Sequence, residues 1–221
     1  MPSRYRALFR GQEAVLKTHR GSDLGALRLA RELATALQAP LFAGSVTRLL
    51  IDLNRSLHHV NLYSAITRTC PENDRRRLAA NYYLPYRNAV ENWITRRDRR
   101  GRTVLHLSVH SFTPVLDGQV RHADIGFLYD PGRALERTLC GAWRRALCRA
   151  APELTLRLNY PYRGTADGFT AYLRHRLPSS AYLGIEIEIN QTHVRSGWKR
   201  LRQVLRTTLK ETLRGMLPSP A

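Results

Sequence analysis

The chain has 221 residues, of which 43% are hydrophobic and 24% charged, so it can bury a sizeable core and is not a disordered chain. Its three cysteines without a CxxC spacing exclude a disulfide scaffold or a cysteine-rich zinc module, and no apolar run reaches the ~20 residues that span a bilayer. The net charge of +19 favours anionic ligands but does not by itself indicate nucleic-acid binding, because arginine is scattered along the whole chain.

The first half of the chain is predicted to contain two helices and one strand. Asp23 or Ser22 caps a first helix that runs to residue 37, and Pro40 follows as a stop. Its apolar face consists of Leu27, Ala30, Leu33 and Leu37. The apolar, partly β-branched residues 41–53 predict a strand, and residues 73–99 predict a long helix interrupted at Pro85.

The second half alternates between strand and helix patterns. Strands are predicted at 103–109, 124–129, 154–158 and 182–189. Helices are predicted at 134–150, 166–176 and 198–214. This alternation favours an α/β fold with layered helices and sheet. We expect a single domain over residues 1–221, given the length of the chain. We expect it in the cytoplasm, because the N-terminus lacks the apolar region of a secretory signal.

The last helix has two distinct faces. Its leucines recur every fourth residue from Leu201 to Leu213, and lysine and arginine lie opposite them. Such a helix either packs one face on the core and solvates the other, or lies on phosphate or a membrane surface. The first interpretation is favoured.

Candidate chemistry lies at the strand ends, because the common phosphate-loop, dinucleotide, zincin and serine-hydrolase motifs are missing. His110 closes the strand pattern LHLSVH and shares one strand face with His106 and Ser108. A neutral imidazole at a strand end suits a metal ion. The alternative is an ordinary packed or surface histidine.

Two carboxylates share a strand in the segment GIEIEINQ. Alternation places Glu186 and Glu188 on one face and the isoleucines on the other. Carboxylates this close repel each other unless a cation separates them, and one of them is a natural general base. The alternative is an edge strand with one solvated face.

Two loops carry the remaining candidates. In the segment DLNRS, Asn54 and Arg55 are suited to bind a carboxylate, although a turn with an ordinary salt bridge would show the same residues. The aromatic loop NYPYRG contains Asn159, Tyr162 and Arg163, and loops of this kind either line a pocket or only turn the chain.

Taken together, these segments resemble the N-formylglutamate amidohydrolase family. The matching stretches are HRGSDLGALRLARELA, VTRLLIDLNRS, YYLPYRNAV, LHLSVHSFTPVLDG, RHADIGFLYDP, NYPYRGTADG and YLGIEIEINQ. They run in order from residue 19 to residue 191. No single string is decisive, but SVHSFTP together with DLNRS and IEIN is fairly specific.

The resemblance implies a fold and a set of roles. The family is similar to zinc carboxypeptidases and aspartoacylases, which implies a phosphorylase/hydrolase-like, three-layer α/β fold with a mixed eight-stranded sheet between helices. By this resemblance His110 is a zinc ligand, with Asp23 as a weaker match for a second. Glu188 is the general base, with Glu186 as the fallback. The substrate-binding residues implied are Asn54, Arg55, Asn159, Tyr162 and Arg163.

The implied reaction is metal-dependent hydrolysis of the amide of an N-acyl acidic amino acid. Zinc lowers the pKa of its water to about 7, and the glutamate moves the proton. The implied partner is therefore a small N-acyl amino acid, whereas a membrane or nucleic-acid partner is not favoured. The oligomeric state stays open.

The chain departs from the family pattern at its start. Family members open with a strand and a segment resembling E-H-x-G-N-x-[IV]-P, which supplies the first metal histidine. Here Met1-Pro2 stands where that segment ends, which predicts a truncated domain with weaker metal binding and an unpaired sheet edge. The alternatives are therefore a catalytically degenerate relative and a basic protein that binds nucleic acid or an anionic surface.

Overall fold

The computed structural model describes residues 2–44 and 46–216. Met1, part of the predicted departure from the family pattern, and Ser45, part of the strand predicted at 41–53, lie outside the described residues. Within it the chain divides into two compact units. Unit 1 consists of Met1–Asp23, Phe42–Val104 and Asp167–Tyr182, and unit 2 consists of Leu24–Leu41, Leu105–Ala166 and Leu183–Ala221. The prediction of a single domain is not tested by this division.

The central element is a mixed four-stranded sheet with the order β1-β6-β4-β5. Its strands are β1 (Val104–Phe112), β4 (Ile125–Leu128), β5 (Leu156–Leu158) and β6 (Tyr182–Asn190). β4 runs parallel to β5 and antiparallel to β6. A separate hairpin joins β2 (Val115–Leu116) to β3 (Gln119–Val120). The described sheet has fewer strands than the eight that the family resemblance implied.

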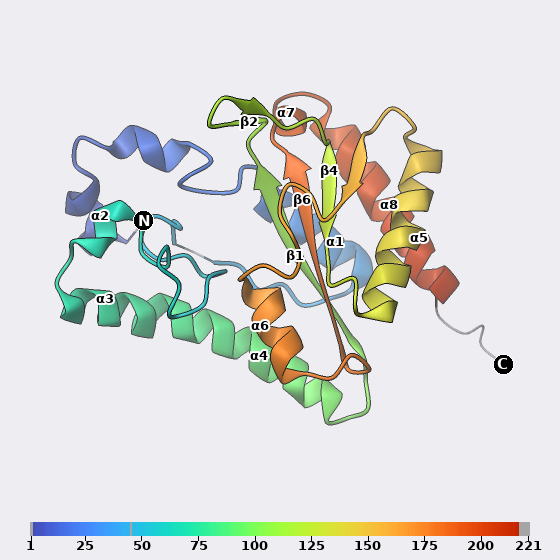
Figure 1. Ribbon diagram of the computed structural model, residues 1–221, viewed down its shortest axis with the longest axis horizontal. Coiled ribbons are helices and arrows are strands. Elements are labelled where there is room, and N and C mark those ends of the chain that lie inside the picture. Colours follow the sequence, from blue (N-terminus) through green and yellow to red (C-terminus); the bar gives the residue numbers. More distant parts are fainter. Residues whose placement is uncertain (1, 45, 217–221) are drawn as a thin grey trace. The chain divides into compact units, whose positions relative to one another are not determined.

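In unit 2, three helices cover one face of the sheet: α1 (Ala26–Leu37), α5 (Ala134–Ala150) and α8 (Trp198–Met216) (Figure 1). Alternation along β6 sends Ile185, Ile187 and Ile189 into the core that these helices form. The leucines of α8 at positions 201, 205 and 209 are buried in the same core, so this helix has one core face and one solvent face, as favoured. A short helix, α7 (Thr192–Arg195), precedes α8.

The start of α1 differs from the prediction. Its N-cap is Gly25, in the left-handed region with φ of 79°, and not Asp23 or Ser22. A Cβ at Gly25 would crowd Val194 and Trp198, so only glycine allows this close turn. The core face of the helix consists of Ala26, Leu29 and Leu33, whereas Leu27 of the predicted apolar face is 43% exposed, because packing on the sheet selects the buried face.

Unit 1 is helical. A single rod is formed by α3 (Glu72–Leu78), a π-helical turn labelled η3 (Ala79–Tyr83) and α4 (Leu84–Asp98) (Figure 1). The π-helical turn directly precedes α4, whose second residue is Pro85, so the rod departs from regular α geometry beside the proline without breaking there. The long helix predicted over 73–99 is therefore present, with a π-helical turn in place of an interruption at Pro85. Smaller helices are η1 (Ser3–Phe9), η2 (Glu13–Lys17), α2 (Ala65–Arg68) and α6 (Phe169–Arg176).

The strand predicted at 41–53 is wrong: the described residues of that segment form turns and coil. Its apolar residues Leu49, Leu50 and Ile51 are instead buried in a core with Tyr5, Phe9 and other residues of unit 1. Its backbone forms local hydrogen bonds that close turns, such as the one from Leu50 N to Thr47 O (3.0 Å). A strand would instead need hydrogen bonds to a neighbouring strand. None of the described helices is both long and apolar enough to cross a membrane.

Candidate functional site

The two carboxylates of β6 lie on the sheet face opposite the helices of unit 2. The antiparallel register sets Glu188 opposite Gly126 and Glu186 opposite Leu128 on β4. Both glutamates are buried, at 7% exposure for Glu186 and 6% for Glu188. Because β6 lies between β1 and β4, the alternative of a solvated edge strand is wrong.

His110 joins these carboxylates from the neighbouring strand. Its Nε2 lies 3.8 Å from Oε2 of Glu186 and 2.9 Å from Oγ of Ser108, so the predicted shared face of Ser108 and His110 is confirmed. At the end of the strands, Gln191 N donates to Phe112 O (3.0 Å). At their other end Val104 N donates to Ala181 O (2.8 Å), so β1 and β6 run parallel (Figure 1). In a parallel ladder these two bonds set Phe112 beside Asn190 and His110 beside Glu188.

The geometry around His110 limits the chemistry it can do. Ser108 and Glu186 both approach the same ring nitrogen. A serine-hydrolase relay uses one imidazole nitrogen for the serine and the other for the carboxylate, so Ser108, His110 and Glu186 do not form such a relay. What the site offers is an imidazole with buried carboxylates beside it, which can accept and return a proton.

The loop Asn159–Gly164 crosses this same sheet face. Asn159 adopts φ of 50°, and its Oδ1 accepts hydrogen bonds from the backbone N–H groups of Tyr129 (3.1 Å) and Gly164 (2.9 Å). The carbonyl oxygen of Tyr160 lies so close over Gly126 that a Cβ there would overlap it. The loop is thereby fixed beside Glu188, and Tyr162 and Arg163 at its tip are exposed.

In unit 1, Asn54 and Arg55 serve the start of α6. Asn54 Oδ1 accepts a hydrogen bond from the Phe169 N–H (2.7 Å), the first residue of that helix. Arg55 Nη1 donates to the carbonyl of Asp167 (2.9 Å) and lies 4.0 Å from its carboxylate. Their substrate-binding role stays a prediction, but part of their bonding capacity is used within the fold.

Arg87 of α4, which the sequence interpretation missed, holds this DLNR turn. It is 4% exposed, and its Nη1 donates to the carbonyls of Leu53 (3.3 Å) and Arg55 (3.2 Å). Its guanidinium lies 4.0 Å from the ring centroid of Phe169. Burial lowers the pKa of Arg87 from its ordinary value, and burial raises the pKa of the adjacent Tyr83 to about 12.

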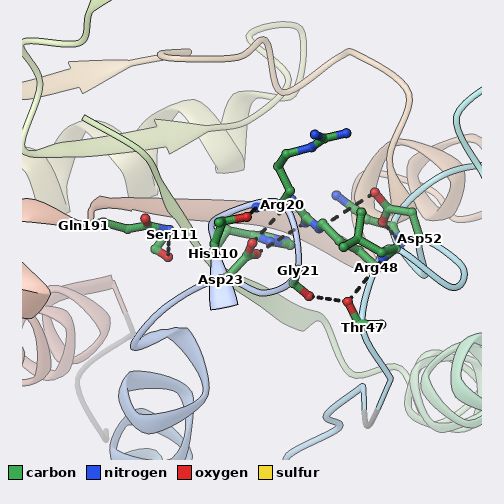
Figure 2. Close-up of polar contacts among 12 residues, drawn as sticks. Arg20, Gly21, Asp23, Thr47, Arg48, Asp52, His110, Ser111 and Gln191 are labelled. Atoms are coloured by element: carbon green, nitrogen blue, oxygen red, sulfur yellow. Dashed lines mark hydrogen bonds and ion pairs between the residues drawn. The ribbon is translucent and has the colours of Figure 1, made fainter. Parts of the chain in front are cut away.

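Asp23, also in unit 1, is paired with a cation. Its Oδ1 lies 3.3 Å from Nη1 of Arg48, and Arg48 also reaches Asp52 at 4.0 Å (Figure 2). Thr47 Oγ1 donates to the carbonyl of Gly21 (2.7 Å) and joins the same two segments of the chain. The proposed metal-ligand role of Asp23 stays a prediction.

The residues present supply part of a zinc site. Within the described ranges, no group of three or more His, Cys, Asp or Glu side chains is arranged to hold a metal ion. Unit 2 offers His110 and Glu186, an imidazole and a carboxylate 3.8 Å apart, whereas a catalytic zinc uses three protein ligands. This donor set does not fit that requirement by itself, so no reaction step below is derived through zinc.

Comparisons with known proteins connect this geometry to a family. The solved structure of a gene product from Agrobacterium tumefaciens is 26% identical, with a TM-score of 0.79, and the match covers 98% of this chain and 86% of that one. An N-formylglutamate amidohydrolase from Ralstonia eutropha has the same fold, with a TM-score of 0.62 at 18% identity over 86% of this chain and 83% of its own. The comparison with curated proteins gives no match.

The sequence profile of one family matches residues 1–194, which is most of the chain. Its description is N-formylglutamate amidohydrolase, in agreement with the resemblance inferred from the ordered segments. Family membership points to hydrolysis of an amide in a small molecule. The chain belongs to the N-formylglutamate amidohydrolase family.

Proposed function

We propose that this protein hydrolyses the amide bond of N-acylated acidic amino acids, with N-formylglutamate as the first substrate to test. The observation that supports this is the placement of His110 beside two buried carboxylates on one sheet face, in a chain of this family. Buried carboxylates flanking an imidazole suit proton transfer to and from a water and a leaving amine.

The proposed proton path uses unit 2 alone. Glu186 or Glu188 takes a proton from a water molecule while the water oxygen attacks the formyl carbon. The C–N bond then breaks, and the protonated glutamic acid returns that proton to the leaving nitrogen, which gives formate and the free amino acid. His110, next to both carboxylates, orients the water and stabilises the charge that develops on the oxygen.

The two glutamates are separable experimentally. Glu186 is the carboxylate whose Oε2 lies 3.8 Å from His110 Nε2, and Glu188 is the neighbour of His110 across the parallel strands. Replacement by glutamine keeps the shape of the side chain but removes its basicity. We expect the glutamine variant at the general base to have a kcat lower by about 10²-fold or more. The glutamine variant at the other glutamate should lose much less. The sequence interpretation placed Glu188 first.

The experiment measures formate release from N-formylglutamate by the wild-type chain and by His110→Ala, Glu186→Gln and Glu188→Gln. Glu211→Gln, an exposed residue of α8, is the matched control and is expected to keep full activity. The zinc dependence implied by the resemblance is tested in the same assay with a chelator, with added Zn²⁺ and by the metal content of His110→Ala. Absence of hydrolysis by the wild type, or hydrolysis indifferent to all three changes, would contradict the proposal.

A further inference from the structure

One arginine of unit 2, Arg121, lies near Phe112 at the C-terminal end of β1, the strand that carries His110. The guanidinium carbon of Arg121 lies 5.1 Å from the ring centroid of Tyr162 and 5.9 Å from that of Phe112. Its Nη1 donates a hydrogen bond to the Tyr162 hydroxyl (3.2 Å). Stacking on an aromatic face combined with a hydrogen bond fixes the orientation of the planar group.

The backbone of Arg121 is fixed as well. Its N–H donates to the carbonyl of Pro114 (2.8 Å), and its carbonyl accepts from Nδ2 of Asn190 (3.3 Å) at the end of β6. The residue therefore has anchors to the chain just after β1 and to β6. An arginine restrained in this way loses little conformational entropy when a ligand binds to it.

The charge of Arg121 is not neutralised by a partner. Among the described residues, no carboxylate lies within 4.0 Å of its guanidinium, whereas Arg200 of the same unit pairs with Glu153 at 2.7 Å. One of its five N–H donors, on Nη1, is hydrogen-bonded to Tyr162. The edge formed by Nε and Nη2 can therefore bind a carboxylate with two parallel hydrogen bonds.

The position of Arg121 relates it to the proposed chemistry. Phe112, one of its two stacking partners, is two residues beyond His110 on the same strand face, about 7 Å along β1. Arg121 therefore lies beyond the end of β1 toward which a substrate with its amide at His110 and Glu188 has to extend its side chain for the two to meet. A cation placed there selects a second negative charge.

We propose that Arg121 binds the side-chain carboxylate of the acyl amino acid and is a specificity-determining residue, with Tyr162 as the residue that positions it. This inference rests on the proposed function and extends it: the resemblance assigned a carboxylate to Asn54 and Arg55, and Arg121 supplies a separate carboxylate site within unit 2. It predicts a preference for acidic over neutral side chains, because an amide in place of the carboxylate gains no charge-assisted pair.

The test compares N-formylglutamate with N-formylglutamine, which has nearly the same shape without the charge. We expect Arg121→Gln to raise KM for N-formylglutamate by about 10- to 100-fold with kcat changed less than about threefold, and to leave KM for N-formylglutamine nearly unchanged. Arg121→Lys should keep part of the discrimination, and Tyr162→Phe should lose a smaller part. Arg144→Gln, exposed on α5, is the matched control.

A second measurement is independent of turnover. Glutarate has two carboxylates and no amide bond, and its binding is measured by calorimetry beside that of its mono-amide. Glutarate binding that is lost in Arg121→Gln, while the thermal stability of the variant stays at the wild-type value, supports the inference even if no substrate is hydrolysed, in which case only the proposed function fails. Equal binding by wild type and variant, or no binding by wild type, overturns the inference.

Discussion

At the scale of single residues, several polar side chains that the sequence marks as candidates use their hydrogen bonds to build loops. Asn54 Oδ1 is bound by the N–H of Phe169, and Asn159 Oδ1 by those of Tyr129 and Gly164. Residue type predicted that these side chains matter. It could not predict their partners, because the contact between Asn54 and Phe169 spans 115 residues of chain and depends on the packing of both segments.

Arg87 is a buried cation that holds the DLNR turn of unit 1, so its loss should lower stability. Replacing it by methionine keeps the apolar stem among Tyr83, Phe169 and Tyr172 but leaves the carbonyls of Leu53 and Arg55 without this donor. We expect Arg87→Met to lower the free energy of unfolding by about 2–4 kcal/mol, and Arg87→Lys to lower it less. Urea denaturation followed by circular dichroism measures both.

The control is Arg96→Met, on an exposed position of the same helix, which should change stability by less than about 0.5 kcal/mol. Equal effects at positions 87 and 96 would show that the buried guanidinium does not hold the DLNR turn.

At the scale of elements, the periodic patterns predicted most helices and strands. The helix at 134–150 was predicted at its observed bounds, and β6 alternates as expected. The strand predicted at 41–53 is wrong because an apolar run is compatible with any buried conformation. The described residues of this segment do not pair with a strand, and Leu49, Leu50 and Ile51 pack on η1. The extension of β1 to Phe112 depends on its pairing with β6, which a local pattern does not contain.

The contact of β4 with the Asn159–Gly164 loop gives an element-scale prediction. A methyl group at Gly126 would overlap the Tyr160 carbonyl, so Gly126→Ala must displace the loop or the strand. We expect a loss of about 2 kcal/mol or more in stability, together with reduced hydrolysis because Glu188 lies directly across from Gly126.

Gly141→Ala is the matched control, since this glycine lies inside α5 and a methyl group there meets only the flexible end of Arg145, at 3.4 Å. It should stabilise the protein by about 0.5–1 kcal/mol. Thermal denaturation of both variants checks the pair, and a Gly126→Ala protein as stable and as active as the wild type would contradict the proposed close approach.

At the scale of the whole molecule, the charge of +19 is the dominant electrostatic property. The leucines of α8 at positions 201, 205 and 209 are buried, so the core of unit 2 covers its apolar face. The solvent face of α8 carries Arg206, Lys210 and Arg214, with Glu211 among them. A folded chain with this excess of positive charge is destabilised by self-repulsion, which salt screens.

We therefore expect the melting temperature to rise by a few degrees as NaCl increases from about 20 to about 300 mM, because the Debye length falls from roughly 20 Å to below 10 Å. Differential scanning calorimetry measures this shift, and choline chloride in place of NaCl controls for specific binding of sodium. A melting temperature that falls with both salts would show that attractive ion pairs outweigh the repulsion.

The sequence by itself determined the family, the α/β class and the residue types at the strand ends, because these depend on ordered local segments and on periodicity. Only the tertiary structure decided which groups meet: His110 with Glu186, Asn159 with the turn at Tyr129, and Arg121 with Tyr162 and Phe112. The physical reason is that strand order, register and loop packing bring together residues far apart in the chain. Those pairings follow from the burial of the whole core and not from any local pattern.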